Sequence, residues 1–245
     1  MSRLLVTILL SILLLLGITC YGECTRKMER VAVIDTGLDL TDPRFSSLLC
    51  KDGNHWDFVL KKPVQSDYNG HGTHVAGLIK KYAGNASYCF LIYRYFEYDI
   101  FSGNDNLKNE IQAIKQAVKD GATIINISGG GRDRSYEECK TIENASSVRF
   151  VLAAGNNGEN IDFGHFYPAC CGSSNITIVG STNKDGVKLS SSNYGNSVTA
   201  WELGLNVEST VPGGTGVMSG TSQATAITTG KIVSKNKNQC HIGKQ

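Results

Sequence analysis

The chain has 245 residues, of which 41% are hydrophobic and 19% charged, and its formal net charge at pH 7 is +2. This length suits one α/β domain with a full hydrophobic core. The nearly balanced charge, without a basic tract, gives no reason to expect a nucleic acid or an anionic membrane surface as partner.

The N-terminus has the pattern of an export signal. Arg3 precedes a short leucine-rich run, and small residues lie near Gly22. A charged start followed by a short apolar core is typical of a secretory signal peptide, and the run is shorter than the about 20 residues that span a bilayer. We expect a signal peptide over residues 1–22 and a secreted or periplasmic domain over residues 23–245. A retained anchor and a lipid on Cys20 stay open as alternatives.

Cysteine usage agrees with export. Removal of residues 1–22 leaves seven cysteines, and export favours disulfides among them, although sequence alone does not give the pairing. Zinc binding is the competing interpretation, but no C-x-x-C pair occurs, and adjacent cysteines cannot easily ligate one ion. The eight cysteines are Cys20, Cys24, Cys50, Cys89, Cys139, Cys170, Cys171 and Cys240.

Five apolar runs predict buried strands. They are rich in Val and Ile and do not alternate with polar residues, as in strands covered on both faces. Residues 105–120 carry apolar positions at helical spacing and are followed by Gly121, which predicts a helix. This alternation predicts an α/β fold with a doubly wound, mostly parallel sheet flanked by helices. The strands are expected over residues 31–34, 89–95, 123–127, 149–153 and 175–179.

Polar or glycine-rich residues follow three of these strands directly. Asp35 follows the first, residues 128–131 (SGGG) follow another, and residues 154–158 (AGNNG) follow a third. In open α/β sheets, ligands bind beyond the carboxyl ends of the strands. The sequence therefore predicts a functional site at this edge of the sheet.

Three glycine-containing segments supply an acid, a histidine and a serine. Asp35 lies in VAVIDTG, His71 in NGHGTHVAG and Ser222 in SGTSQAT. A serine hydroxyl needs a base to become nucleophilic, and the base needs an orienting anion. The chain order Asp, His, Ser is that of subtilisin, one of several folds that carry this triad. From about residue 30 to 230 the chain resembles the subtilisin-like serine protease family (peptidase S8).

The resemblance implies a serine endopeptidase that acts on protein or peptide substrates, with the catalytic domain over residues 23–245. Ser222 would be the nucleophile, His71 the base and Asp35 its orienting anion. Asn156 matches the family's oxyanion donor, whose loss in subtilisin itself costs roughly 10²–10³ in turnover. The first specificity pocket would lie between two strand ends, with the ring of Phe166 filling it so that small side chains are preferred. The expected substrate-binding residues are Ser128, Gly129, Gly130, Ala153, Ala154, Gly155 and Phe166.

The chain also departs from the family pattern. The helix after Ser222 is expected to end within residues 231–245, so that the C-terminal portion is shortened, and little room remains for a propeptide between Gly22 and Val31. Arg44 stands where an acidic calcium ligand is frequent. We expect no metal and no cofactor.

Other functions have weaker support. A catalytically silent binding protein with the same fold is the main alternative. A serine esterase would favour Gly-x-Ser-x-Gly, where residues 220–224 read GTSQA. Asp-Thr-Gly could be half of an aspartic protease dyad, but a second copy is absent. His71 and His74 suggest a metal, but the acid of His-Glu-x-x-His is missing, and in the resemblance His74 is only a neighbour of the base.

Overall fold

A computed structural model describes residues 28–97, 105–163 and 166–236, so the expected signal peptide lies outside the described residues. Within them, eight strands form one sheet in the order β3-β2-β4-β1-β5-β6-β7-β8. All neighbours are parallel except β2 and β3 at one edge. The strands are β1 (Glu29–Asp35), β2 (Trp56–Asp57), β3 (Lys62–Pro63), β4 (Tyr88–Arg94), β5 (Ile124–Ile127), β6 (Arg149–Ala153), β7 (Ile176–Thr182) and β8 (Ala200–Leu203).

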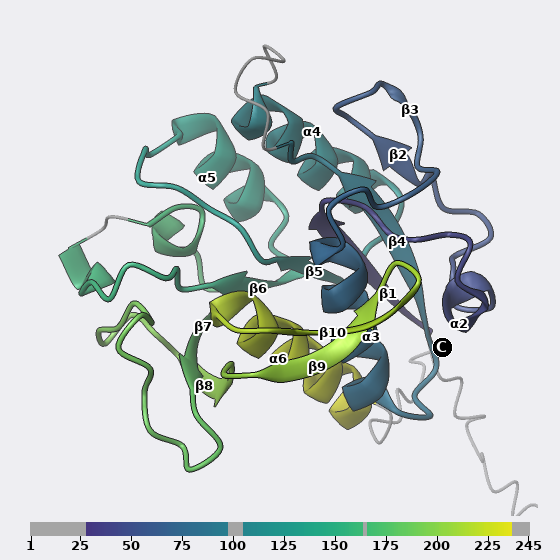
Figure 1. Ribbon diagram of the computed structural model, residues 1–245. Helices are drawn as coiled ribbons and strands as arrows, with labels where there is room; N and C mark the ends of the chain where they lie inside the picture. Colours follow the sequence, from purple (N-terminus) through teal and green to yellow (C-terminus); the bar gives the residue numbers. More distant parts are fainter. Residues whose placement is uncertain (1–27, 98–104, 164–165, 237–245) are drawn as a thin grey trace, which may run out of the picture. The chain divides into compact units, whose positions relative to one another are not determined.

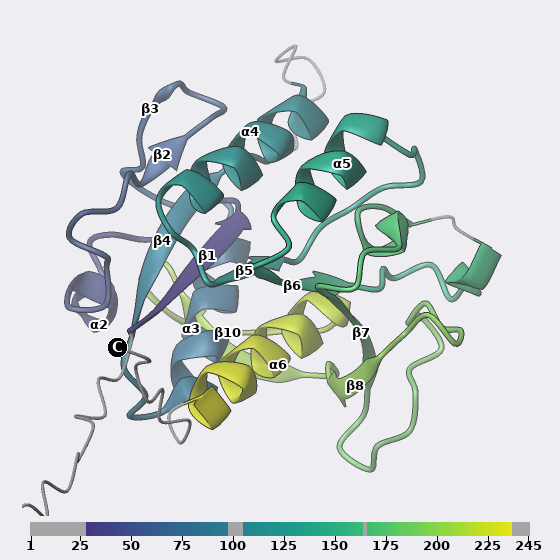
Figure 2. The same ribbon diagram turned by 180° about the vertical axis from the view of Figure 1, so that it is seen from behind.

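Helices cover both faces of this sheet (Figures 1 and 2). On β1, Ala32 and Ile34 belong to the core under α4 and α5, whereas Val31 and Val33 belong to the core under α3 and α6. Alternate side chains of a strand point to opposite faces, so a strand buried on both faces must be apolar throughout. The longer helices of the described residues are α3 (His71–Ala83), α4 (Asn106–Lys119), α5 (Tyr136–Asn144) and α6 (Thr221–Asn236).

The predicted doubly wound sheet, its five strands and the helix over residues 105–120 are confirmed. The shorter elements were missed because they carry no run of apolar residues. They are β2, β3, β8, the helix α2 (Pro43–Ser46), the 3-10 turns η1 (Ile161–Phe163) and η2 (Ala169–Cys171), α5, and the antiparallel hairpin of β9 (Val207–Val211) and β10 (Gly214–Met218). The hairpin packs through β9 on α3 (Figure 1).

Two disulfides confirm the expected oxidised cysteines. Cys50 pairs with Cys89, which joins the segment after α2 to the start of β4. Cys139 pairs with Cys171, which joins α5 to η2. Cys170 pairs with no other cysteine of the described residues.

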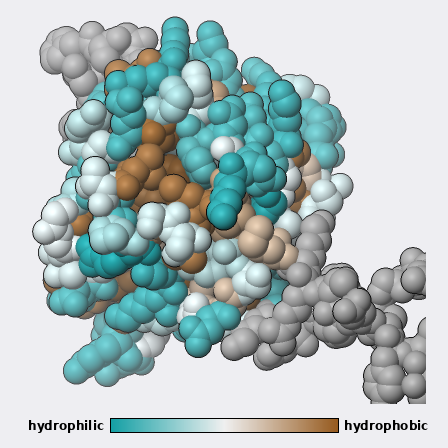
Figure 3. Space-filling view, turned by 90° about the vertical axis from the view of Figure 1, so that its right-hand side faces the viewer, coloured by the Kyte–Doolittle hydropathy of each residue, from teal (hydrophilic) through white to brown (hydrophobic). Residues whose placement is uncertain are grey.

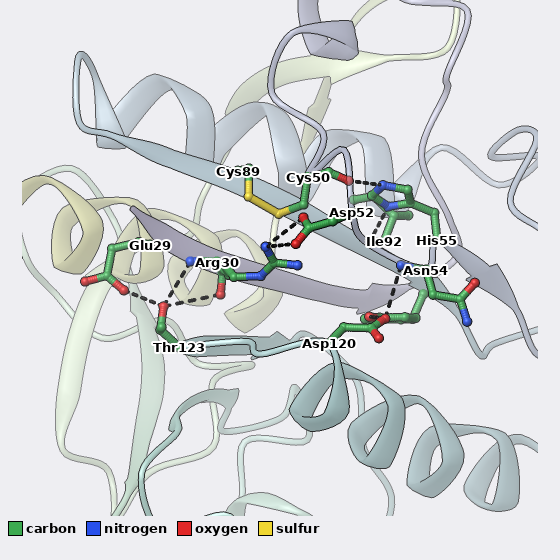
Figure 4. Close-up of a disulfide and its surroundings, with 11 residues drawn as sticks. Glu29, Arg30, Cys50, Asp52, Asn54, His55, Cys89, Ile92, Asp120 and Thr123 are labelled. Carbon is green, nitrogen blue, oxygen red and sulfur yellow. Dashed lines mark hydrogen bonds and ion pairs between the residues drawn. A yellow bond between two sulfur atoms is a disulfide. The ribbon is translucent and has the colours of Figure 1, made fainter. Parts of the chain in front are cut away.

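The first disulfide lies at the amino ends of the strands (Figure 4). Beside it, Arg30 donates to both carboxylate oxygens of Asp52 at 2.8 and 3.0 Å. His55 contacts the Cys50 carbonyl through Nε2 at 3.1 Å. These contacts join the loop before β2 to β1 and, through the disulfide, to β4.

The surface on the side of α2, β2 and β3 is mostly hydrophilic, and hydrophobic residues gather most clearly near the middle of the view (Figure 3). In the described part of the chain, no helix is both long and apolar enough to cross a membrane.

Candidate active site

Asp35 and His71 meet at the carboxyl edge of the sheet. Asp35 ends β1, and His71 begins α3; His71 Nδ1 lies 2.8 Å from Asp35 Oδ1. A Cβ on Gly72 would lie 2.2 Å from the Gly37 carbonyl oxygen, so this close approach of helix to strand requires glycine. Because an ionised carboxylate can only accept, Nδ1 carries the proton and Nε2 is left as an acceptor.

The charge of Asp35 sets the basicity of His71. It raises the pKa of His71 above its ordinary value of 6.5, while burial of the ring acts in the opposite direction. The hydrogen bond that His71 donates to Asp35 and the charge of Asp67 also raise this pKa. The imidazolium is therefore stabilised, as a base that takes up a proton requires.

Asp67 organises the turn before His71, and sequence analysis did not single it out. Its Oδ1 accepts from Thr36 Oγ1 at 2.9 Å, from the Asn69 N–H at 3.1 Å and from the Gly70 N–H at 2.8 Å. Its Oδ2 accepts from the Thr73 N–H at 2.8 Å and from Thr73 Oγ1 at 2.7 Å. This buried carboxylate thus ties the end of β1 to the first turn of α3. An Asp two residues before Asn-Gly is the sequence signal for such a side-chain turn.

Ser222 lies in the first turn of α6, at the same edge of the sheet. Its hydroxyl donates to the Ser128 carbonyl oxygen at 2.8 Å. No hydrogen bond joins Ser222 to His71 in the described residues, which differs from the direct contact that a serine and its base would make. To donate to His71 instead, the hydroxyl would have to leave this carbonyl oxygen.

Asn156 lies beside this first turn of α6, three residues beyond the end of β6. Its Oδ1 accepts from the Thr221 N–H at 2.9 Å and from Thr221 Oγ1 at 3.1 Å. These two bonds hold the amide oxygen, so the Asn156 Nδ2 group is left to donate elsewhere. Because Ser222 directly follows Thr221, the side-chain amide of Asn156 lies close to Ser222.

The predicted substrate-binding residues lie on two paired strand ends. β5 and β6 are parallel neighbours, and the sequence continues into Ser128–Gly130 after one and Gly155 after the other. A Cβ on Gly130 or on Gly155 would lie 2.7 Å from the ring of Phe166. The Phe166 ring, 9% exposed, therefore packs against both glycines and fills the space between the two strand ends.

A separate cavity of about 510 Å³ opens beside Asp35 and His71. It is lined by residues 128–133 and also by Tyr95, Phe96 and Leu107. Neither Phe166 nor the end of β6 lines it. Two acidic residues, Glu110 of α4 and Glu138 of α5, also line this cavity. Sequence analysis missed both, because the two helices meet only in the folded chain.

His74 and Arg44 have structural contacts. His74 is fully buried, its Nε2 lies 3.0 Å from the Val207 carbonyl oxygen, and burial lowers its pKa. Arg44 pairs with Asp42 and donates to a carbonyl of β10. Within the described ranges, no three His, Cys, Asp or Glu side chains gather closely enough to hold a metal ion.

A family model for the subtilase family (Peptidase S8) matches residues 26–239. The chain belongs to this family of serine peptidases. The match includes the segments of Asp35, His71, Asn156 and Ser222.

Similar proteins share this region. The chain is 29% identical over 220 residues to Subtilisin-like protease 6 of Arthroderma benhamiae, covering 83% of this chain and 50% of that protein. It is 32% identical over 234 residues to Thermophilic serine proteinase of Bacillus sp. (strain AK1), covering 87% and 54%. It is 33% identical over 218 residues to Intracellular serine protease of Paenibacillus polymyxa, covering 83% and 65%. The chain thus spans about half the length of the first two relatives.

Solved structures agree on the fold. A cold adapted subtilisin-like serine proteinase superposes with a TM-score of 0.71 at 28% identity, covering 82% of this chain and 72% of the other. A lanthipeptide protease superposes with a TM-score of 0.72 at 27% identity, covering 84% and 72%.

Proposed function

We propose that this chain is a serine endopeptidase in which Ser222 is the nucleophile, His71 the general base and Asp35 its orienting anion. The observation that carries the proposal is the 2.8 Å contact between His71 Nδ1 and Asp35 at the strand edge where Ser222 also lies. It leaves His71 Nε2 free to accept the serine proton once the hydroxyl turns from Ser128. Membership of the subtilase family supports the same assignment.

The reaction follows from these positions. Ser222 Oγ attacks the peptide carbonyl, and its proton passes to His71 Nε2. The Asn156 Nδ2 group and the Ser222 N–H stabilise the negative oxygen of the tetrahedral intermediate. His71 then gives the proton to the leaving amine, and water hydrolyses the acyl-enzyme by the same route.

The proposal includes a preference for small residues directly before the cut bond. The Phe166 ring occupies the space between the ends of β5 and β6, where a larger substrate side chain would have to enter. One methylene in such a pocket contributes about 1–3 kcal/mol to discrimination.

We also propose that the protein works outside the cytosol. Two disulfides support an oxidising compartment. The expected signal peptide over residues 1–22 gives the route. An intracellular relative exists, so family membership alone does not decide location.

A fluorophosphonate probe tests the catalytic assignment, because it labels only an activated serine. Label is expected on the wild type, absent in Ser222→Ala and strongly reduced in His71→Ala. Ser219→Ala, an exposed serine three residues away, is the matched control and should label normally.

The second candidate is a catalytically silent binding protein. The hydrogen bond of the Ser222 hydroxyl to Ser128, rather than to His71, is the observation that favours it. A folded wild type that resists the probe would support this candidate and refute the peptidase.

A further inference from the structure

Two buried carboxyl groups lie under the cavity beside His71. Glu110 of α4 is 4% exposed, Glu138 in the first turn of α5 is 2% exposed, and both line the cavity. Burial and then the neighbouring charge of Glu138 raise the pKa of Glu110 well above its ordinary value. Two carboxylates at one buried site do not both ionise readily, so the pair shares a proton.

This pair lacks a cationic partner. Glu110 Oε1 is buried without a hydrogen-bond partner, and neither acid forms an ion pair with any described residue. An unpaired buried oxygen is costly, at about 1–3 kcal/mol. Glu110 Oε1 is therefore an unpaired, buried acceptor in a side chain that lines the cavity.

Tyr95, which follows β4, is neutral beside the pair, because burial and then the charges of Glu110, Asp35 and Glu138 raise its pKa well above the ordinary value. On the cavity rim, Asp133 is exposed, and Arg132 pairs with Glu159. Buried acids thus line the cavity, and the only Lys or Arg among its described lining residues, Arg132, is already paired.

Gly129 makes room for this arrangement. A Cβ there would lie 2.1 Å from the Tyr95 hydroxyl oxygen, so Tyr95 can pass beneath residues 128–130 only because position 129 has no side chain. The cavity volume of about 510 Å³ is in the usual range of ligand pockets, about 300–1,000 Å³.

We propose that Glu110 and Glu138 bind the cationic side chain of a substrate lysine or arginine that precedes the cut bond. This inference rests on the proposed function. Residues 128–130, expected to pair with the substrate backbone before the cut, form one wall of the cavity. Phe166, which fills the space between the ends of β5 and β6, does not line the cavity, so the basic residue is not the one directly before the cut.

Cation binding is coupled to the shared proton. Burial raises the pKa of Glu138 to about 7 and that of Glu110 well above its ordinary value. A cation favours the ionised form, so its entry releases the proton. Preference for arginine over a neutral side chain should therefore grow as pH rises through about 7 and shrink in acid.

The test uses the full chain with Ser222→Ala, which binds without cutting. Fluorescein-labelled eight-residue peptides of alanine and serine carry one arginine or, in the matched peptide, one citrulline of the same shape without charge. Fluorescence anisotropy at pH 8.5 should give at least about tenfold tighter binding of the arginine peptide. At pH 6 this ratio should fall at least about threefold.

Variants of the two acids test whether Glu110 and Glu138 cause the preference for the arginine peptide. In the same background, Glu110→Gln and Glu138→Gln should each reduce the arginine preference to about threefold or less. Glu137→Gln, an exposed neighbour on α5 that pairs with Lys115, should keep it. Near-UV circular dichroism verifies folding, and if a Gln variant does not fold, the arginine-to-citrulline ratio and its pH dependence decide alone.

Equal binding of the two peptides, or a preference that survives both Gln variants, would overturn the proposal. Because this assay needs no catalysis, its result is independent of probe labelling. An unlabelled protein that prefers arginine would refute the peptidase and keep the cation site.

Discussion

The buried carboxylate of Asp67 should be essential for stability although it is outside the proposed triad. In Asp67→Asn, the amide keeps one oxygen, which can still accept from Thr36, Asn69 and Gly70. The new NH₂ group would then face the N–H of Thr73, which is fully buried. Two donors meet, and the Thr73 N–H is left unpaired.

The magnitude follows from these contacts. An unpaired buried N–H costs about 1–3 kcal/mol, and bonds to a neutral acceptor contribute about 1 kcal/mol less each than bonds to a charged one. Three bonds are weakened in this way. Since neighbouring effects do not add fully, we expect a loss of about 3–5 kcal/mol in the free energy of unfolding.

Guanidinium unfolding at pH 7 measures this loss, with Ser222→Ala present in every variant to prevent self-digestion. Asp185→Asn, an exposed acid in a turn, is the control and should stay within about 0.5 kcal/mol of its parent. A loss below about 1 kcal/mol in Asp67→Asn would show that the five hydrogen bonds do not hold the His71 turn.

Three further predictions concern activity. His71 must be neutral to accept a proton, and Asp35 raises its pKa, so peptidase activity should rise with pH with a midpoint above 6.5. This midpoint should move to lower pH in Asp35→Asn, and a maximum near pH 4 in the rate profile would contradict the prediction. Phe166→Gly should extend cleavage to large residues before the cut in a peptide library, whereas a wild type that already prefers Phe or Leu would contradict the filled pocket. Arg44, at the position where an acidic calcium ligand would be expected from the family resemblance, pairs with Asp42, so EDTA should leave activity and Tm nearly unchanged. A large drop reversed by calcium or zinc would reveal a metal site.

Local pattern was sufficient for the main elements of the fold. Each of the five predicted strands contributes side chains to the buried cores, so its central residues are mostly apolar and can be recognised without knowing its neighbours. Parallel strands end at the same edge of the sheet, so the sequence alone predicts that the residues following them lie close together. Asp35 and His71 do meet there, 2.8 Å apart.

Contacts between distant segments were decided only by the tertiary structure. The pairing of the cysteines, the direction of the Ser222 hydroxyl and the anchoring role of Asp67 depend on which loops and helices pack together. Glu110 and Glu138 lie on different helices, and each alone looks like an ordinary solvent-facing acid of an amphipathic helix. Their burial and their shared proton arise because α4 and α5 pack side by side on the same face of the sheet, which no local periodicity encodes.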